Sequence, residues 1–409
     1  MPYSQAPRAR TTHWSLIVGI VAALALALVA LTSVWRASEV GERPPAAELP
    51  YFGFNEGWGT AWQGQALDDA IAAAAQAGAN TNRLQVRWFD VVGTAGAWDE
   101  EAWSRYRTAY QAMLASGINP VVLLLAAPRG TDQVGDPNWA APECPGGAAS
   151  PPVPEYDQLW KDFVARAALE FPDALAVQIW NEPNSEEYWG GCDVDPARYV
   201  QLVELARQAL GPPAAMPIVS AGLNSAVDEP VGMTWTTYLQ RALDAGLMTP
   251  GRAQFLGLHP YPQPDTCGAT PQHTARALVD AMSLQVEQAE ALTPAEIWVT
   301  EFGATSAGDL PGECRALGPT AQAQVVAAMY DRLADTDSVE AGIVHQLVDH
   351  AVPNVDPSAA SYWSNFGVTK NATAESAFLE RKDAYWCLAG RRGRPNHSTV
   401  SCSLEESTG

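Results

Sequence analysis

The sequence predicts an α/β protein that folds as a (β/α)8 TIM barrel behind a single N-terminal transmembrane helix. From Tyr51 onward, short apolar runs alternate with helical stretches, which is typical of βα units around a parallel sheet. Glu182 and Glu301 each follow one of these runs, and the carboxyl ends of barrel strands meet at one face. With 409 residues, the chain is long enough for one barrel, which needs about 250.

The first 50 residues predict attachment to a membrane. An uncharged apolar run of 22 residues, 14–35, is long enough as a helix to cross a hydrocarbon core of about 30 Å. Arg8 and Arg10 precede it, which favours a cytoplasmic N-terminus, a cell-membrane location and an extracellular remainder. Signal cleavage and secretion are the alternative, but the apolar run is long for a signal peptide and no convincing small-x-small cleavage site precedes Arg36. We therefore expect a cytoplasmic segment at 1–13, a signal anchor at 14–35, a linker at 36–50, the barrel at 51–390 and a tail at 391–409.

The net charge of −22 at pH 7 limits the ligands that the protein can bind. Nucleic acids and anionic lipid surfaces both need a basic face, so the charge argues against either one. It fits a soluble, monomeric extracellular domain and a neutral substrate. No Gly-x-Gly-x-x-Gly follows the first strand and His-Glu-x-x-His is absent, so we expect neither a dinucleotide nor a metal, and no other cofactor.

Eight apolar runs bounded by turn residues are candidate strands, and amphipathic stretches between them are candidate helices. Several helices end in glycine signals, such as Gly78 and Gly117. The expected strands are Tyr51–Asn55, Asn82–Val86, Pro120–Ala126, Leu175–Trp180, Pro217–Ala221, Phe255–His259, Glu296–Thr300 and Gly342–Leu347. The expected helices are Ala66–Ala77, Glu101–Ser116, Tyr156–Phe171, Pro196–Leu210, Thr234–Gly246, Gln272–Leu292 and Thr320–Asp335.

All six cysteines follow the apolar run, and none forms a Cys-x-x-Cys pair. An even number of cysteines outside the membrane predicts disulfides. Sequential pairing is the simplest connectivity, and it suits neighbouring loops of a barrel. The pairs would be Cys144–Cys192, Cys267–Cys314 and, at the tail, Cys387–Cys402.

Two carboxylates on one barrel face indicate hydrolysis of a glycosidic bond. That reaction needs one protonated carboxyl group to release the leaving oxygen and one ionised group opposite it. Glu182 ends the fourth strand and Glu301 ends the seventh. Carboxyl groups about 5–5.5 Å apart would suit a retaining enzyme, and groups about 6.5–9.5 Å apart an inverting one. The sequence leaves this choice open.

Neighbouring residues can tune the two carboxyl groups. Asn181 can bind a sugar hydroxyl, while Arg83 can supply a cation and Tyr261 a hydrogen-bond donor that keep Glu301 ionised. His259, Asn55 and His345 are further candidates for binding substrate or supporting the carboxylates. Two of these candidates have a structural alternative: Arg83 can form an ion pair, and His259 can be an ordinary core histidine. A short Asn-Glu-Pro string alone is also weak evidence.

Four motifs resemble those of clan A glycoside hydrolases, particularly families 39 and 5. The resemblance covers roughly 51–386. The motifs are Gly78-Ala79-Asn80 followed by Arg83 and Trp88, Asn181-Glu182-Pro183, His259-Pro260-Tyr261 and Thr300-Glu301-Phe302-Gly303.

The resemblance implies a role for each matching residue. Glu182 would be the general acid/base and Glu301 the nucleophile of a retaining mechanism through a covalent glycosyl-enzyme. Asn181 would contact the 2-hydroxyl, and Arg83 and Tyr261 would support Glu301.

The chain also departs from the family pattern. Relatives often carry a histidine where the first strand ends in Asn55-Glu56, and an aromatic residue on strand eight, where His345 stands instead. These departures bear on which sugar is bound more than on the chemistry. Glu56 also lies near the rim of the barrel, which makes it a third candidate carboxylate. Seven tryptophans fall in or near strand-end loops, of which we expect Trp180, Trp189 and Trp363 to contact sugar: Trp58, Trp62, Trp88, Trp139, Trp180, Trp189 and Trp363.

Three functions remain compatible with these observations. The first is a membrane-anchored retaining β-glycosidase that cleaves an extracellular polysaccharide or oligosaccharide. The second is a sugar-binding surface protein that keeps the barrel without turnover. The third is a transglycosylase that remodels the cell's own polymer.

Overall fold

The computed structural model describes residues 48–60, 62–92, 97–128, 149–190, 193–212, 216–227, 232–263, 266–308, 310, 313–349, 362–371 and 379–404. These residues belong to one compact unit, Ala47–Gly409; a second unit, Met1–Ala46, contains none of them. The predicted transmembrane helix at 14–35 and the predicted Cys144–Cys192 pair lie outside the described residues. Within the described ranges, no helix is both long and apolar enough to cross a bilayer.

Parallel strands form the curled sheet of a (β/α)8 barrel, and every strand predicted from the sequence is present with small shifts of its ends. Their order in the sheet is β5-β4-β3-β2-β1-β9-β8-β7-β6. The strands are β1 Tyr51–Glu56, β2 Arg83–Arg87, β3 Val121–Leu125, β4 Ala176–Ile179, β5 Ile218–Val219, β6 Leu223–Asn224, β7 Leu256–His259, β8 Ile297–Phe302 and β9 Val339–His345.

The fifth barrel position holds two short strands, β5 and β6, in place of the single strand expected at Pro217–Ala221. β5 pairs with β4, and β6 pairs with β7. Parallel bridges from Val219 to Phe255 and from Asn181 to Gly222 join the two edges, so the sheet closes. A Cβ at Gly222 would stand 2.0 Å from Nε2 of His259, which explains the glycine at this step.

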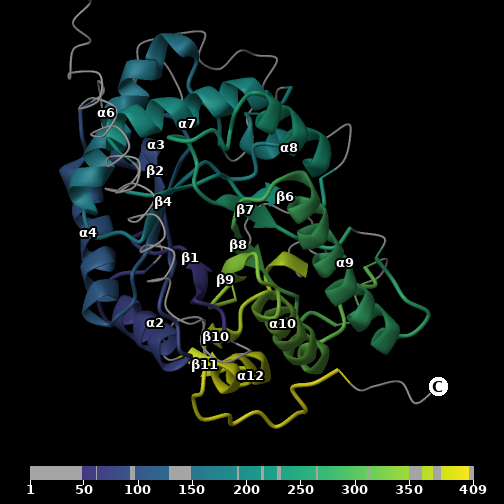
Figure 1. Ribbon diagram of the computed structural model, residues 1–409. Helices are drawn as coiled ribbons and strands as arrows, with labels where there is room; N and C mark the ends of the chain where they lie inside the picture. The colour runs from purple at the N-terminus through teal and green to yellow at the C-terminus, as the bar shows by residue number, and fades with distance from the viewer. Residues whose placement is uncertain are drawn as a thin grey trace, which may run out of the picture. The chain divides into compact units, whose positions relative to one another are not determined.

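Helices surround the strands (Figure 1), with α2, α4 and α6 on one side and α9 and α10 on the other. Asp99, Asp195 and Thr270 cap three of them by accepting backbone N–H groups of the first turn. Each helix expected from the sequence forms. The helices are α2 Gly64–Gln76, α3 Trp88–Val91, α4 Glu100–Ala115, α6 Asp157–Glu170, α7 Pro196–Leu210, α8 Trp235–Asp244, α9 Pro271–Leu292, α10 Pro319–Ala334 and α12 Asp383–Arg391.

An aromatic cluster fills the space between the first half of the sheet and its helices. Trp88 stacks on Phe163 with ring centroids 5.5 Å apart, and Trp103 and Trp160 contact the same phenylalanine. All three tryptophans are buried. These three tryptophans therefore serve the packing of the core.

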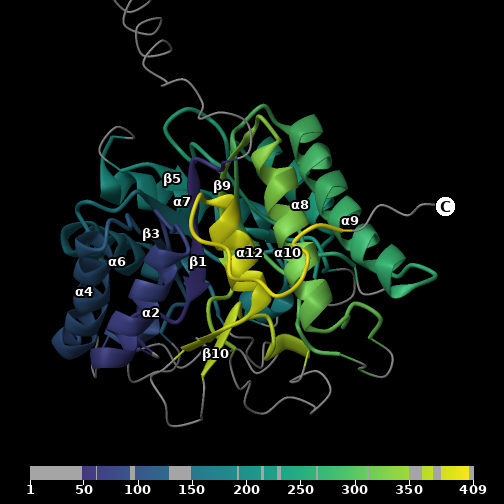
Figure 2. The same cartoon turned by 90° about the horizontal axis from the view of Figure 1, so that it is seen from below.

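The C-terminal segment packs where the strands begin. Arg392 donates hydrogen bonds to the carbonyl oxygens of Leu49 and Gly78, which precede β1 and β2. Tyr385 of α12 donates to the carbonyl oxygen of Ala73 in α2. Figure 2 shows α12 next to α10. This segment therefore lies at the opposite end of the barrel from the strand-end glutamates.

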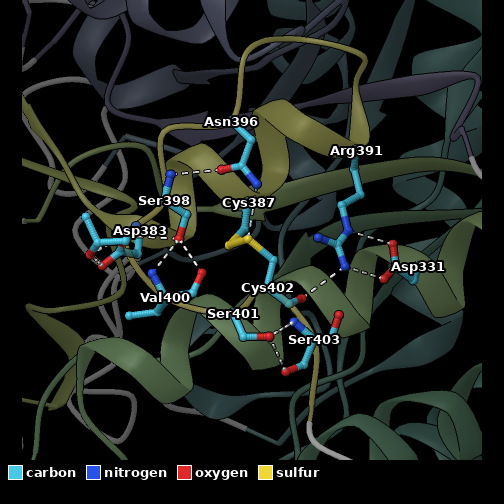
Figure 3. The surroundings of a disulfide bond; sticks show 11 residues. Asp331, Asp383, Cys387, Arg391, Asn396, Ser398, Val400, Ser401, Cys402 and Ser403 are labelled. Carbon is cyan, nitrogen blue, oxygen red and sulfur yellow. Dashed lines mark hydrogen bonds and ion pairs between the residues drawn. A yellow bond between two sulfur atoms is a disulfide. The ribbon is translucent and has the colours of Figure 1, made fainter.

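Two of the predicted disulfides are confirmed. Cys387–Cys402 joins α12 to the tail, and Arg391 nearby binds both Asp331 of α10 and the carbonyl oxygen of Cys402 (Figure 3). Cys267–Cys314 joins the loop after β7 to the loop after β8. These loops border the carboxyl ends of strands that carry candidate site residues.

Candidate active site

The turn after β4 holds Glu182 in an uncommon backbone conformation. Trp180 and Glu182 have φ angles of 71° and 41°, in the left-handed region that residues with a Cβ rarely adopt. Backbone hydrogen bonds from Trp180 to Leu124 and from Glu182 to Gly222 hold this turn between its neighbouring strands. Such strain costs about 1–3 kcal/mol per residue and is typically found at functional sites.

The two glutamates predicted from the sequence lie together. One carboxylate oxygen of Glu182, one of Glu301 and a ring nitrogen of His259 are all within 4.8 Å of one another. Both glutamates are largely buried, with 6% and 7% of their surface exposed. The barrel thus brings together two carboxyl groups that are far apart in the sequence.

Three side chains of the described residues donate hydrogen bonds to the carboxylate of Glu301. Arg83 donates to Oε1 at 2.5 Å, Asn55 donates to the same oxygen at 2.9 Å, and Tyr261 donates to Oε2 at 3.1 Å. Arg83 and Tyr261, which the sequence suggests as supports of Glu301, thus both contact its carboxylate.

These surroundings favour the ionised form of Glu301. Burial raises the pKa of this carboxyl group. In acid, the charges of His259, His345 and Arg83 outweigh burial, and the hydrogen bond from Tyr261 adds to their effect. The pKa is held at about 2, below its ordinary value of 4.5.

Two polar side chains in the described part of the chain contact Glu182. Nδ1 of His259 lies 2.7 Å from Oε1, and the side-chain amide of Asn224 donates to Oε2 at 3.0 Å. The amide oxygen of Asn224 accepts from the backbone of Ala226, which fixes the orientation of the amide. Asn224 was missed in the sequence because it lies on the unexpected strand β6.

Asn181 has its amide oxygen bound to Nη2 of Arg83 at 2.7 Å. No described residue accepts from the amide nitrogen of Asn181, so the two N–H donors remain for a ligand. Arg83 also donates from Nε to Gln178, which contacts Thr300. Gln178 and Thr300 are site residues that sequence reasoning missed, although a glutamine inside the apolar strand β4 was a visible signal.

His345 and Trp363 border the carboxylates. Nδ1 of His345 lies 3.2 Å from the Asn55 amide nitrogen and 3.8 Å from Oε2 of Glu301. Trp363 is 41% exposed, and its ring centroid lies 6.3 Å from that of Tyr261. Tyr261 and Trp363 also line a cavity of about 170 Å³. Trp363 thus offers an exposed aromatic face, and its contact with sugar stays a prediction.

Trp180 and Trp189 differ from the expectation of sugar contact. Trp180 has no exposed surface, and its indole N–H donates to the carbonyl oxygen of Tyr188. Trp189 is 5% exposed and meets Trp180 edge to face. A side chain without an open face cannot stack on a sugar, so these tryptophans support the turn that carries Glu182.

Glu56, the third candidate carboxylate, is held by the backbone. Its oxygens accept from the N–H groups of Gly57 and Val348. It is not part of the group formed by Glu182, His259 and Glu301. These contacts favour a structural role in joining β1 to the segment after β9.

The donor atoms of Glu182, His259 and Glu301 are close enough to hold a metal ion. Glu301, however, already has a guanidinium, an amide and a hydroxyl as partners. A divalent cation would compete with the positive charge of Arg83 for the same carboxylate. The partners of Glu301 therefore fit a carboxylate that contacts substrate directly better than one that binds a metal ion.

Residues 44–335 match the family model described as cellulase, glycosyl hydrolase family 5. The match covers more than half of the chain, including both candidate glutamates. The chain belongs to glycosyl hydrolase family 5.

Solved structures with the same fold include several glycosidases. A family 39 glycoside hydrolase from Bacteroides cellulosilyticus WH2 is 16% identical, with a TM-score of 0.54, over 86% of this chain and 65% of that one. An exo-beta-1,4-mannosidase from Opitutaceae bacterium strain TAV5 is 17% identical, with a TM-score of 0.58, over 85% and 60%. A family 1 beta-glucosidase from Humicola insolens is 14% identical, with a TM-score of 0.55, over 86% and 99%.

These identities establish the barrel fold alone. The family 5 chain spans less than two thirds of the length of the first two structures. No curated protein sequence matches it significantly.

Replacing Tyr261 by phenylalanine should make the enzyme more sensitive to acid. The change removes a donor that lowers the pKa of Glu301, so this pKa rises. The resemblance implies that Glu301 is the nucleophile, and a nucleophilic carboxylate must be ionised, so the acid limb of kcat/KM should move to higher pH. We expect a fall in kcat/KM at neutral pH of roughly 10- to 100-fold, as for a hydrogen bond to a charged group. The measurement is kcat/KM against pH with an aryl glycoside.

Tyr110→Phe is the matched control, because this buried hydroxyl binds the backbone of Asp173 away from the carboxylates. Its acid limb should stay at the wild-type position. An unmoved limb in the Tyr261 variant would show that this hydroxyl does not tune Glu301.

Proposed function

We propose that this family 5 enzyme is a retaining β-glycosidase that uses Glu301 as nucleophile and Glu182 as general acid/base. The observation that carries the proposal is the short separation of the two carboxylates, whose nearest grouped oxygens lie within 4.8 Å. An inverting enzyme needs a gap of about 6.5–9.5 Å to place a water between its carboxyl groups. A gap this short favours direct attack on the sugar by Glu301.

The two steps balance as a double displacement. In the first, Glu301 forms a bond to the anomeric carbon while the glycosidic bond breaks and Glu182 protonates the departing oxygen. In the second, Glu182 takes a proton from water, the water oxygen bonds to the anomeric carbon and Glu301 is released. Asn181 would donate to the 2-hydroxyl of the sugar, where such bonds strengthen in the transition state.

The proposed substrate is a neutral polysaccharide or oligosaccharide outside the cell. The net charge of −22 would repel a polyanion. Trp363 offers an aromatic face near Tyr261 on which the apolar face of a sugar ring can stack. Two disulfides support an oxidising compartment, and the apolar run at 14–35 supports a membrane anchor.

The test is to follow the products and to trap the intermediate. A panel of polysaccharides and aryl β-glycosides first identifies a cleaved substrate. Proton NMR of the earliest product should then show the β-anomer, and a 2-deoxy-2-fluoro glycoside should label a peptide that contains Glu301. Formation of the α-anomer first would contradict the retaining mechanism, and a label on another residue would contradict the assignment of Glu301.

A further inference from the structure

A continuous chain of hydrogen bonds connects the two glutamates beneath the site. It runs from Arg83 through Gln178, Thr300 and His259 to Glu182. The three middle members have no exposed surface. Since water does not reach them, each donor and acceptor must find its partner within the protein.

The direction of the first bonds follows from chemistry. A guanidinium can only donate, so Nε of Arg83 donates to Oε1 of Gln178, 2.7 Å away. The amide nitrogen of Gln178 therefore points the other way, where it donates to the carbonyl oxygen of Ser220 at 2.9 Å. The same nitrogen donates to Oγ1 of Thr300 at 3.0 Å. Thr300 is thus an acceptor in this bond.

The remaining bonds then have one arrangement that satisfies every group. The hydroxyl of Thr300 keeps one proton to donate, and among the described residues its remaining partner is Nε2 of His259, 3.0 Å away. Nε2 must then accept, so the proton of the neutral imidazole sits on Nδ1. Nδ1 lies 2.7 Å from Oε1 of Glu182 and donates to it.

We propose that Thr300 is a positioning residue that holds His259 near neutral pH as the Nδ1–H tautomer, so that His259 donates to Glu182 and cannot accept its proton. In the other tautomer, a bare ring nitrogen would stand 2.7 Å from the acid and share the proton that the leaving oxygen needs. The second oxygen of Glu182 faces Asn224, whose amide also donates. Neither partner of Glu182 then competes with the substrate for its proton. The catalytic part of this inference rests on the proposed role of Glu182, whereas the tautomer does not.

The direct test observes the ring nitrogens of His259. The full chain is labelled with ¹⁵N-histidine, and the His259 signals, among six histidines, are those lost in His259→Gln. At neutral pH, the wild type should show a protonated Nδ1 and an unprotonated Nε2. Thr300→Val should lose this fixed pattern, and Thr300→Ser, which restores the hydroxyl, should recover it. A wild-type Nε2–H signal, or an unchanged Thr300→Val spectrum, would overturn the inference.

Thr81→Val is the matched control. Thr81 is equally buried, but its hydroxyl donates to the carbonyl oxygen of Asn119 at the start of the strands. The same change there should leave the His259 spectrum as in the wild type. A shift in this control would attribute the effect to general loosening of the barrel and would contradict a specific role of Thr300.

The kinetic test separates positioning from general damage. Thr300→Val should lower kcat/KM by roughly 10- to 100-fold for substrates with poor leaving groups, as removal of an orienting partner does elsewhere. It should have little effect on a dinitrophenyl glycoside, whose leaving group needs no proton. Equal losses on both substrates would contradict the inference. If no form of the enzyme cleaves any glycoside, the proposed function fails, yet the nitrogen spectrum still decides the tautomer.

Discussion

Replacing Glu301 by glycine should abolish hydrolysis and leave a site that azide can repair. In the proposed mechanism Glu301 forms the covalent bond of the first step, so its loss should lower kcat by roughly 10⁵- to 10⁶-fold, as in other enzymes that lose a nucleophile. Arg83, Asn55 and Tyr261 would remain, and these donors can bind a small anion in the space of the carboxylate. With an activated β-glycoside, azide should therefore restore turnover and give the α-glycosyl azide, which NMR identifies.

Glu56→Gln is the control for this experiment. Glu56 is as buried as Glu301, but it accepts from two backbone N–H groups. This variant should keep kcat within about tenfold of the wild type, since it removes no group that reacts with substrate. Full activity in Glu301→Gly, or azide rescue in Glu56→Gly, would contradict the assignment of the nucleophile.

Replacing Glu182 by glycine should produce a loss that depends on the leaving group. General acid catalysis contributes about 10²- to 10⁴-fold, so substrates with poor leaving groups should lose that factor. A dinitrophenyl glycoside should still form the glycosyl-enzyme, which then accumulates and lowers KM because no base activates water. Azide, which needs no base, should release it as the β-glycosyl azide. The opposite product configurations of the two glycine variants distinguish acid/base from nucleophile.

Glu187→Gln is the control for Glu182. Glu187 is exposed at the rim, and its pKa is raised by partial burial and by the charge of Glu182. A general electrostatic effect of losing one negative charge should appear in this variant as well. We expect its dependence on leaving group to match the wild type; a loss like that of Glu182→Gly would reassign the acid to Glu187.

The sequence was sufficient for the barrel and for the two glutamates, because both depend on local patterns. Apolar runs that end in Glu182 and Glu301 mark strands that open into loops, and parallel strands bring such ends to one face. The disulfides Cys267–Cys314 and Cys387–Cys402 followed from sequential pairing of the cysteines.

The remainder of the site depends on contacts between distant strands. Gln178 and Thr300 look like ordinary strand residues until the barrel interior brings them together at 3.0 Å. Asn224 depends on the split of the fifth barrel position, which no periodicity reveals. The burial of Trp180 could not be predicted from the sequence either, because a tryptophan at the end of a strand can face the site or the helices. In the structure it packs against Trp160 of α6.

The left-handed backbone conformation of Glu182 makes the glycine variant at this position suitable for binding an uncleaved glycan. Glycine adopts a φ of 41° without the steric penalty that a Cβ imposes, so Glu182→Gly relaxes the backbone while it removes the acid. This variant should consequently be at least as resistant to heat as the wild type, and more resistant than Glu182→Ala. Because the variant cleaves unactivated glycans slowly, it should bind such a glycan without cutting it. The bound glycan could then be isolated with the protein and identified.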